Sequence, residues 1–214
     1  MSDRQPKRPL RNALAKVVPD AILRERAIIL RLGATAGPIY AKLRLLDHVG
    51  AHSQTDALIN PNAHVFLFVC FGNIMRSPMA EALFRKAAEK ANLPVSACSA
   101  GLHAIAGTQP DPRALTVAKE MNVPLTDHRA QLLTPALVAG ADVVFAMDYQ
   151  NKAELLARYP DHQRKVFMLG AFGEGADRHR EIPDPYSGEL DATRRCYTSI
   201  QHCIRNLTSQ LKKV

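Results

Sequence analysis

A cysteine and an arginine stand at the two ends of a short segment that contains a glycine. The segment reads Cys70-Phe71-Gly72-Asn73-Ile74-Met75-Arg76-Ser77-Pro78. A cysteine thiolate is a strong nucleophile, and a guanidinium group can hold two oxygens of a phosphoryl group at once. This pair therefore suits attack by sulfur on a bound phosphate. A buried cysteine at the end of a strand is also a common small core residue, so the pair needs a supporting context.

The residues on either side of the segment supply that context. The apolar run 64–69 is either a buried strand or part of a helix. Its short length, its β-branched and aromatic residues and the glycine that follows favour a strand. Residues 78–86 read as a helix, because Ser77 is a good N-cap and Pro78 suits the first helical position. The sequence predicts a strand, a tight loop and a helix N-terminus.

This arrangement is an anion site, because the loop amides and the helix N-terminus direct free N–H groups at one spot. Gly72 lets the backbone approach a ligand, and Asn73 tolerates a left-handed conformation. The same positive field favours a thiolate at Cys70, and the Ser77 hydroxyl can donate a hydrogen bond to it. We therefore predict that the phosphoryl group is bound by Arg76 together with a set of loop residues: Phe71, Gly72, Asn73, Ile74, Met75 and Ser77.

The motif Val-Cys-x-Gly-Asn-Ile-x-Arg-Ser-Pro around Cys70 resembles the signature of the low-molecular-weight protein tyrosine phosphatases. The resemblance extends over about residues 64–212 and leaves residues 1–60 outside. It implies hydrolysis of phosphotyrosine and other aryl phosphates through a phosphocysteine intermediate, with Cys70 as the nucleophile. No metal or other cofactor is expected, because the loop N–H groups and Arg76 supply the electrostatic stabilisation.

Expulsion of the leaving oxygen requires a proton donor, and Asp184 is the candidate. It lies between Pro183 and Pro185, which stiffen the loop and keep it out of a helix. On the residues alone, an Asp-Pro pair is equally consistent with a simple turn. The resemblance favours the acid, since relatives carry theirs in a downstream Asp-Pro-Tyr, and here it follows Cys70 by 114 residues. Tyr186 can then stack on a phosphotyrosine ring.

The resemblance also implies supporting residues and a type of partner. Ser99 and His128 stand where relatives brace the loop asparagine, although His128 is otherwise readable as an ordinary half-buried histidine. The cleft wall at 102–107 is aliphatic, similar to that of bacterial enzymes tied to exopolysaccharide-regulating tyrosine kinases. The expected partner is a phosphotyrosine protein, such as a bacterial tyrosine kinase, and no nucleic acid is expected.

Strand and helix patterns alternate through the rest of the chain. Further strands are predicted at 95–99, 142–146 and 165–169, and further helices at 111–121, from Asp148 onward and at 190–212. This alternation predicts an α/β fold of three layers, in which a four-stranded parallel sheet has helices on both faces. Ligands of such sheets bind at the carboxyl ends of the strands, where Cys70 lies.

The 214 residues suit one domain with an extension, and the net charge of +8 is concentrated in that extension. Residues 1–60 carry 10 Lys/Arg against 5 Asp/Glu. We predict a basic disordered tail at 1–18, a helical extension and linker at 19–62, and a phosphatase domain at 63–214. The helical pattern breaks near Gly33 to Pro38, which indicates one or two helices. This extension packs on the domain or on another copy of the chain, or it lies on a membrane surface.

The cysteine pattern bears on the cellular compartment and on rival functions. Four cysteines lie at positions 70, 98, 196 and 203, without a Cys-x-x-Cys pair or zinc-ligand spacing. A thiolate enzyme needs a reducing compartment, and neither a signal peptide nor an 18-residue apolar run is visible, so a cytoplasmic location is expected. A thiol-dependent arsenate reductase would need closely paired cysteines. A non-catalytic phosphoprotein-binding module is disfavoured by intact Cys70, Arg76 and Asp184.

Overall fold

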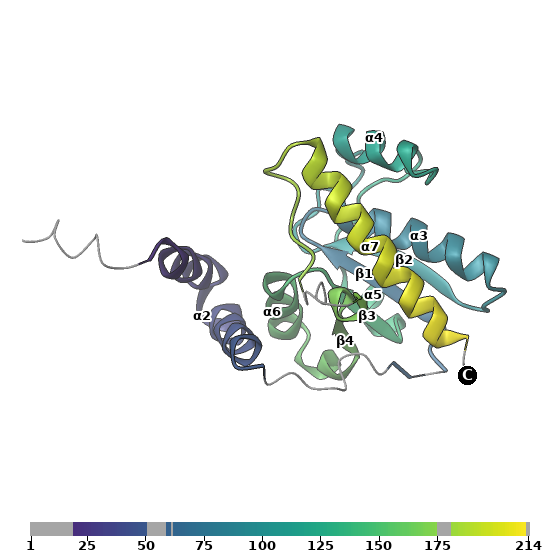
Figure 1. The fold of residues 1–214 in the computed structure, drawn as a ribbon. Coiled ribbons are helices and arrows are strands. Elements are labelled where there is room, and N and C mark those ends of the chain that lie inside the picture. Colours follow the sequence, from purple (N-terminus) through teal and green to yellow (C-terminus); the bar gives the residue numbers. More distant parts are fainter. Residues whose placement is uncertain (1–18, 51–58, 61, 175–180, 213–214) are drawn as a thin grey trace, which may run out of the picture.

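A four-stranded parallel sheet forms the centre of the protein (Figure 1). The computed structural model describes residues 19–50, 59–60, 62–174 and 181–212. The strands are β1 (Val65–Cys70), β2 (Ser96–Gly101), β3 (Val143–Ala146) and β4 (Val166–Met168). They lie in the order β2-β1-β3-β4, and every neighbouring pair is parallel. The predicted sheet is confirmed, and the predicted tail at 1–18 lies outside the described residues.

Helices cover both faces of this sheet, which confirms the three-layer prediction (Figure 1). One face carries α3 (Arg76–Lys90) and α7 (Leu190–Leu211), with α4 (Pro112–Glu120) beside α7. The other carries α6 (Tyr149–Arg158) and α5 (Pro135–Gly140), a short helix that the sequence patterns did not reveal. Two 3-10 turns flank β4: η2 (Pro160–Lys165) and η3 (Leu169–Phe172).

The central strand β1 explains why this part of the sequence is continuously apolar. A parallel strand between two helix layers is buried on both faces, and alternate side chains enter different cores. Phe66 and Phe68 point into the core under α3 and α7, whereas Leu67 and Val69 point into the core under α6. The strand ends at Cys70, so the cysteine is fixed at the carboxyl edge of the sheet.

The start of α3 differs from the sequence prediction. The helix begins at Arg76, with Met75 as N-cap and no side-chain capping bond, so the assignment of Ser77 as the N-cap is wrong. The Ser77 hydroxyl lies 3.0 Å from the Cys70 sulfur and accepts a bond of 2.9 Å from Asn73. The hydroxyl also lies 3.4 Å from the Ala100 carbonyl in β2, so its contacts are with the loop and β2 and not with the helix terminus.

The N-terminal helix α2 (Asp20–His48) is a hairpin of two helical segments that meet at Gly33. Gly33 has φ 74° and ψ −168°, which interrupts the helix within the region where the sequence predicted a break. The hydroxyl of Tyr40 in the second segment donates a 2.7 Å bond to Glu25 in the first. Ala36 and Tyr40 are buried in the core against α6. The extension therefore packs on the sheet domain, which is one of the alternatives that the sequence left open.

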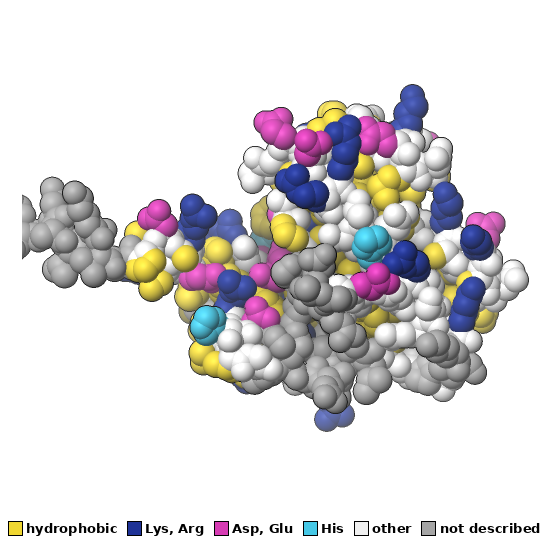
Figure 2. Space-filling model, in the orientation of Figure 1, with side chains coloured by type: hydrophobic (Ala, Val, Ile, Leu, Met, Phe, Trp, Pro, Cys, Tyr) yellow, Lys and Arg dark blue, Asp and Glu magenta, His cyan; other side chains and the backbone are white. Residues whose placement is uncertain are grey.

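The outer surface of α2 is of mixed character (Figure 2). Its exposed large hydrophobic side chains lie among charged ones: Ile22, Leu23, Leu30, Leu45, Leu46 and, just after the helix, Val49. Within the described part of the chain, no helix combines the length and the apolar character required to cross a bilayer.

The α2 hairpin depends on close backbone contact at Gly37. A Cβ atom at this position would lie 2.6 Å from the carbonyl oxygen of Ile29 in the first segment. We predict that Gly37→Ala separates the two segments and lowers the free energy of unfolding by about 1–3 kcal/mol. Urea unfolding measures the change, with Gly140→Ala as the control, because a Cβ at Gly140 meets no atom within 4 Å. Equal stability of both variants would contradict the close contact.

Candidate active site

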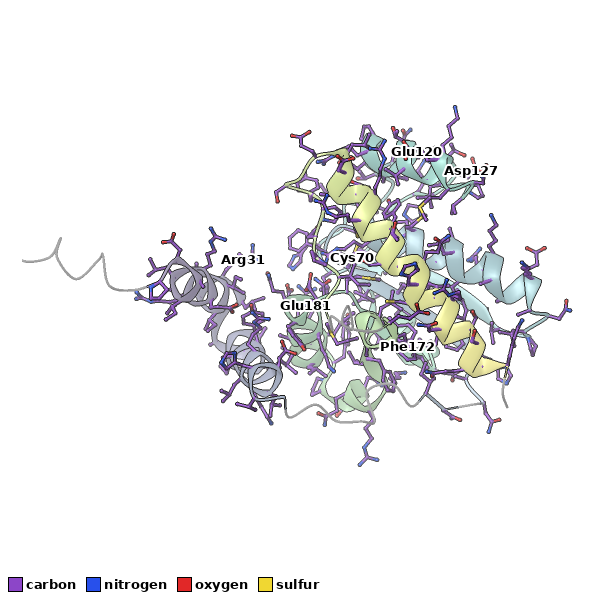
Figure 3. All side chains as sticks on the ribbon, in the orientation of Figure 1. Arg31, Cys70, Glu120, Asp127, Phe172 and Glu181 are labelled. Carbon is purple, nitrogen blue, oxygen red and sulfur yellow. The ribbon has the colours of Figure 1, made fainter. Side chains whose placement is uncertain are left out.

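The loop after β1 forms the floor of a cavity of about 300 Å³. Cys70 lines this cavity and is only 3% exposed. Figure 3 labels it among the side chains of the sheet domain. The Cys70 sulfur contacts the Ser77 hydroxyl at 3.0 Å and accepts a 3.3 Å hydrogen bond from the backbone N–H of Asn73. The remaining lining comes from the loop and from two other segments: Phe71, Gly72, Ile74, Met75, Arg76, His103, Ile105, Thr108, Asp184 and Tyr186.

Asn73 holds the loop in shape from below. It is fully buried, with φ 55°, so the side chain lies under the loop and not in the cavity. Its side-chain nitrogen, Nδ2, donates to the hydroxyl groups of Ser77 and Ser99, both at 2.9 Å. The side-chain oxygen of Asn73 accepts a hydrogen bond from the backbone N–H of Gln131. The backbone carbonyl oxygen of Asn73 lies 2.8 Å from His128 Nε2. Ser99 and His128 thus lie against the loop asparagine, while Asn73 and Ser77 do not line the cavity.

The end of β2 packs directly against the same loop. A Cβ atom at Gly101 would lie 2.8 Å from the carbonyl oxygen of Phe71 and 2.9 Å from the amide nitrogen of Asn73. Only a glycine permits this approach without displacing the loop backbone. The loop is therefore positioned by two neighbouring strands, β1 through the chain and β2 through contact.

Arg76 is the most constrained charged residue of the site, since its side chain is only 2% exposed. One terminal nitrogen donates to Asp148 at 2.6 Å and to the Ile182 carbonyl at 3.0 Å. The other donates to Asp184 at 2.5 Å. Burial alone would lower the pKa of Arg76, but Asp148, Asp184 and Cys70 outweigh it and raise the pKa above its ordinary value. The guanidinium is therefore a permanent positive charge beside the sulfur.

Asp184 stands at the mouth of the cavity, with its side chain 44% exposed. Its second oxygen accepts the Tyr186 amide at 3.1 Å, which fixes the carboxyl group relative to that ring. The guanidinium of Arg113 lies 5.8 Å from the centre of the Tyr186 ring, within cation–π range. Tyr186 is 60% exposed, so one face of the ring is open to a ligand.

The sequence did not assign a site role to Asp148 or Arg113, and it placed His103 only within the aliphatic cleft wall at 102–107. Asp148 caps α6 and lies two residues after the end of β3. That placement was the available signal, because the end of β3 shares an edge of the sheet with Cys70. His103 stacks on Phe71 with ring centres 4.6 Å apart and bonds Glu154 at 2.7 Å. The Phe71 ring, which the sequence placed in substrate binding, is thereby held at the rim.

Together these groups can bind a tetrahedral oxyanion and react with it. The backbone N–H of Asn73 donates to the Cys70 sulfur, and the guanidinium of Arg76 lines the same cavity. The carboxyl group of Asp184, which pairs with that guanidinium and is 44% exposed, also lines the cavity. An oxyanion held by Arg76 would place its central atom above the sulfur and its outward oxygen near Asp184.

Comparisons with known proteins agree with this geometry. Residues 65–214 match the family model described as low molecular weight phosphotyrosine protein phosphatase. The protein-arginine-phosphatase of Bacillus subtilis is 36% identical over 69% of this chain and 96% of its own. The probable low molecular weight protein-tyrosine-phosphatase EpsP of Ralstonia nicotianae is 40% identical over 63% and 87%. The structure of Vibrio vulnificus Wzb in complex with benzylphosphonate matches with TM-score 0.61 and 29% identity, over 72% of this chain and 100% of that one.

We predict that Asn73→Ala weakens oxyanion binding, because the loop loses three side-chain hydrogen bonds that fix its amides. The expected loss of affinity for inorganic phosphate is about 10-fold or more, measured by calorimetric titration. Asn122→Ala is the matched control, since Asn122 has the same φ of 55° but lies outside the cavity lining. If both variants bound phosphate as the unaltered protein does, Asn73 would not organise the loop.

Proposed function

The chain belongs to the low molecular weight phosphotyrosine protein phosphatase family and is a phosphatase, and we propose that it hydrolyses phosphotyrosine in proteins through a phosphocysteine at Cys70. The family resemblance read from the loop signature is confirmed by the match over residues 65–214. One observation supports the proposal above all others. The sulfur of Cys70, the guanidinium of Arg76 and the carboxyl group of Asp184 line one cavity.

In the first step the Cys70 thiolate attacks phosphorus, so a sulfur–phosphorus bond forms as the bond to the tyrosine oxygen breaks. Asp184 donates its proton to that oxygen, which leaves as neutral tyrosine. Arg76 and the loop amides bind the other phosphoryl oxygens and stabilise the charge that develops on them. The Ser77 hydroxyl, 3.0 Å from the sulfur, can donate a hydrogen bond that stabilises the thiolate.

In the second step Asp184, now a carboxylate, takes a proton from water. The water oxygen bonds to phosphorus as the sulfur–phosphorus bond breaks, which releases inorganic phosphate and restores the Cys70 thiolate. The partly exposed position of Asp184 at the cavity entrance gives water access to it. The same carboxyl group thus serves as acid and then as base.

The character of the cavity wall favours an aromatic leaving group. Phe71 and Tyr186 provide ring faces at the rim, and Ile74 and Ile105 provide aliphatic surface between them. Benzylphosphonate, a phosphonate that carries an aromatic ring on a methylene group, is bound by the Wzb relative. Phosphoarginine is the second candidate substrate, because a relative at 36% identity is a protein-arginine-phosphatase. Its charged guanidinium would need acidic partners, and the one carboxyl group among the lining residues, that of Asp184, pairs with Arg76.

The remaining cysteines are poorly placed for a redox relay to Cys70. Burial raises the pKa of Cys196 and of Cys203 to about 12, so neither thiol is a thiolate at neutral pH. Cys98 lies half-buried within β2 and not on a mobile loop. These positions disfavour arsenate reduction through a disulfide cascade.

The partner and compartment belong to the same proposal. Relatives named EpsP and Etp are protein-tyrosine-phosphatases, and they support a phosphotyrosine protein as the partner here. A bacterial tyrosine kinase is the specific partner that we propose. We propose a cytoplasmic location because a thiolate nucleophile requires a reducing compartment. Residues 63–214 are the proposed catalytic domain. Self-association or membrane contact would use the exposed apolar side chains of α2.

The substrate class is tested with two matched peptides that carry phosphotyrosine or phosphoarginine, assayed with a chelator present. We expect kcat/KM to be at least about 10-fold higher for phosphotyrosine, since only its ring can stack on the rim. Cys70→Ser is the control and should hydrolyse neither peptide while still binding phosphate. A preference for phosphoarginine would overturn the substrate assignment, and turnover by Cys70→Ser would remove Cys70 from its role.

Asp184→Asn tests the acid. We expect kcat for phenyl phosphate, whose leaving group is poor, to fall about 100-fold, and kcat for p-nitrophenyl phosphate to fall much less. The physical reason is that nitrophenolate is stable without a proton and phenolate is not. An equal loss on both substrates would assign the acid to another group.

A further inference from the structure

One ion pair joins the N-terminal helix α2 to the segment that carries the proposed acid. A terminal nitrogen of Arg44 donates to a carboxylate oxygen of Glu181 at 3.0 Å. Glu181 lies three residues before Asp184, and its side chain lies on the side of the domain that faces α2 (Figure 3). Arg44 precedes the residues that match the family, which begin at position 65. A part of the chain outside the family match thus contacts the catalytic segment.

Glu181 and Ile182 anchor the segment 181–186 to the sheet. The second oxygen of Glu181 accepts the backbone N–H of Tyr149, at the start of α6, at 2.9 Å. The amide of Ile182 donates to the Met147 carbonyl at 2.7 Å, and the Ile182 carbonyl accepts from Arg76. The orientation of Glu181 therefore bears on the direction in which the chain leaves toward Asp184.

Arg44 is itself held in place by both halves of the α2 hairpin. Its Nε and a terminal nitrogen donate to Glu25 at 3.1 and 2.8 Å, and Glu25 also accepts the Tyr40 hydroxyl. The guanidinium lies 5.9 Å from the centre of the Tyr149 ring, whose hydroxyl donates to Asp47 at 2.8 Å. Arg44 is thus presented to Glu181 in a fixed position and is not a freely rotating surface cation.

The charges around the anchor explain why a cation from α2 matters. Asp148 and Asp184 flank the guanidinium of Arg76, and Glu181 is a third carboxylate whose neighbours include Asp148. Burial raises the pKa of Glu181, whereas the Tyr149 amide and Arg44 oppose that rise and stabilise the charged form. Without Arg44, Glu181 would keep its burial and the repulsion from Asp148 and Asp47, and its anchoring contact would weaken.

We propose that Arg44 and Glu181 are positioning residues that hold Asp184 over the cavity, so that the N-terminal hairpin completes the acid–base machinery of this enzyme. The inference rests on the proposed role of Asp184. Arg44 touches neither the cavity nor the reacting atoms, and its effect passes through Glu181 to the loop. Its loss should therefore affect the steps that need Asp184 and spare the binding of phosphate by Arg76 and the loop amides.

The test uses Arg44→Gln in the full chain, with Lys42→Gln as the control. Lys42 is an exposed cation two residues away on the same helix, so it matches the change in charge. We expect Arg44→Gln to lower kcat for phenyl phosphate about 10-fold and kcat for p-nitrophenyl phosphate less than about 2-fold, as partial loss of acid catalysis requires. Inorganic phosphate should inhibit both variants as it inhibits the unaltered enzyme. A uniform loss on both esters, or wild-type kinetics, would overturn the proposal.

A double-mutant cycle with Glu181→Gln separates the ion pair from general damage to α2. Gln retains an acceptor for the Tyr149 amide but has no charge to pair with Arg44. In the Glu181→Gln background, Arg44→Gln should cause no further loss in kcat for phenyl phosphate. Additive losses would show that Arg44 acts by another route and would reject the proposal.

Hydrogen exchange gives a readout that does not depend on turnover. The Ile182 amide should exchange faster in Arg44→Gln than in Lys42→Gln, because its bond to Met147 is next to the weakened anchor. If the unaltered protein hydrolyses neither ester, the proposed function fails, and the exchange result alone decides whether α2 holds the segment. Unchanged exchange at Ile182 would overturn the positioning role in either case.

Discussion

The buried guanidinium of Arg76 is the interaction on which the site depends. A charge that is 2% exposed is costly to bury unless opposite charges and hydrogen-bond acceptors surround it. Here the acceptors are Asp148 at the start of α6, Asp184, and the carbonyl group of Ile182. These groups come from segments far apart in the chain. Their positions are therefore coupled, since displacement of any one removes part of the compensation for the buried charge.

The same coupling explains how binding and proton transfer are organised together. Arg76 begins α3, so its position follows that of the loop that starts at Cys70. Asp184 reaches the cavity by pairing with Arg76, which places the acid close to any oxyanion that the guanidinium holds. The residue proposed to bind phosphate thus also orients the residue proposed to protonate the leaving group.

Asn73 holds the uncharged part of the site, the backbone of the loop after Cys70, as the partners of Arg76 hold the charged part. A loop that directs its amides into a cavity must satisfy its other polar groups from behind, because unpaired buried groups are costly. The Asn73 side chain does so by bonding Ser77, Ser99 and the Gln131 backbone. The loop is consequently rigid before a ligand arrives, which avoids reorganisation during the reaction.

The hairpin α2 extends this organisation beyond the residues that match the family. Its inner face, with Ala36 and Tyr40, is buried against α6, and its Arg44 reaches the catalytic segment through Glu181. Helix α6 is the element common to both effects, since it supplies Asp148 to Arg76 and the Tyr149 amide to Glu181. We therefore expect a change in the packing of α2 on α6 to alter the position of Asp184, the proposed acid.

The sequence by itself determined the local parts of this protein. The Cys70–Arg76 spacing, the strand before it, the helix after it and the Asp184 loop are all readable, because strand pattern, turn chemistry and short spacing act within a few residues. The parallel sheet followed from the alternation of strands and helices. The family resemblance identified Ser99 and His128, which no local pattern would have singled out.

Only the tertiary structure decided which distant side chains meet. Arg76 pairs with Asp148 across 72 residues and with Asp184 across 108, and Arg44 pairs with Glu181 across 137. Such contacts depend on strand order and on how the helices pack on the sheet. Neither can be predicted from the spacing of residues within one segment of the sequence. The same holds for Ser77, for which the sequence allowed both a helix cap and a hydrogen bond to the Cys70 thiolate. In the folded protein the Ser77 hydroxyl contacts the Cys70 sulfur and accepts a hydrogen bond from the Asn73 side chain, because packing brings these buried groups within hydrogen-bond distance.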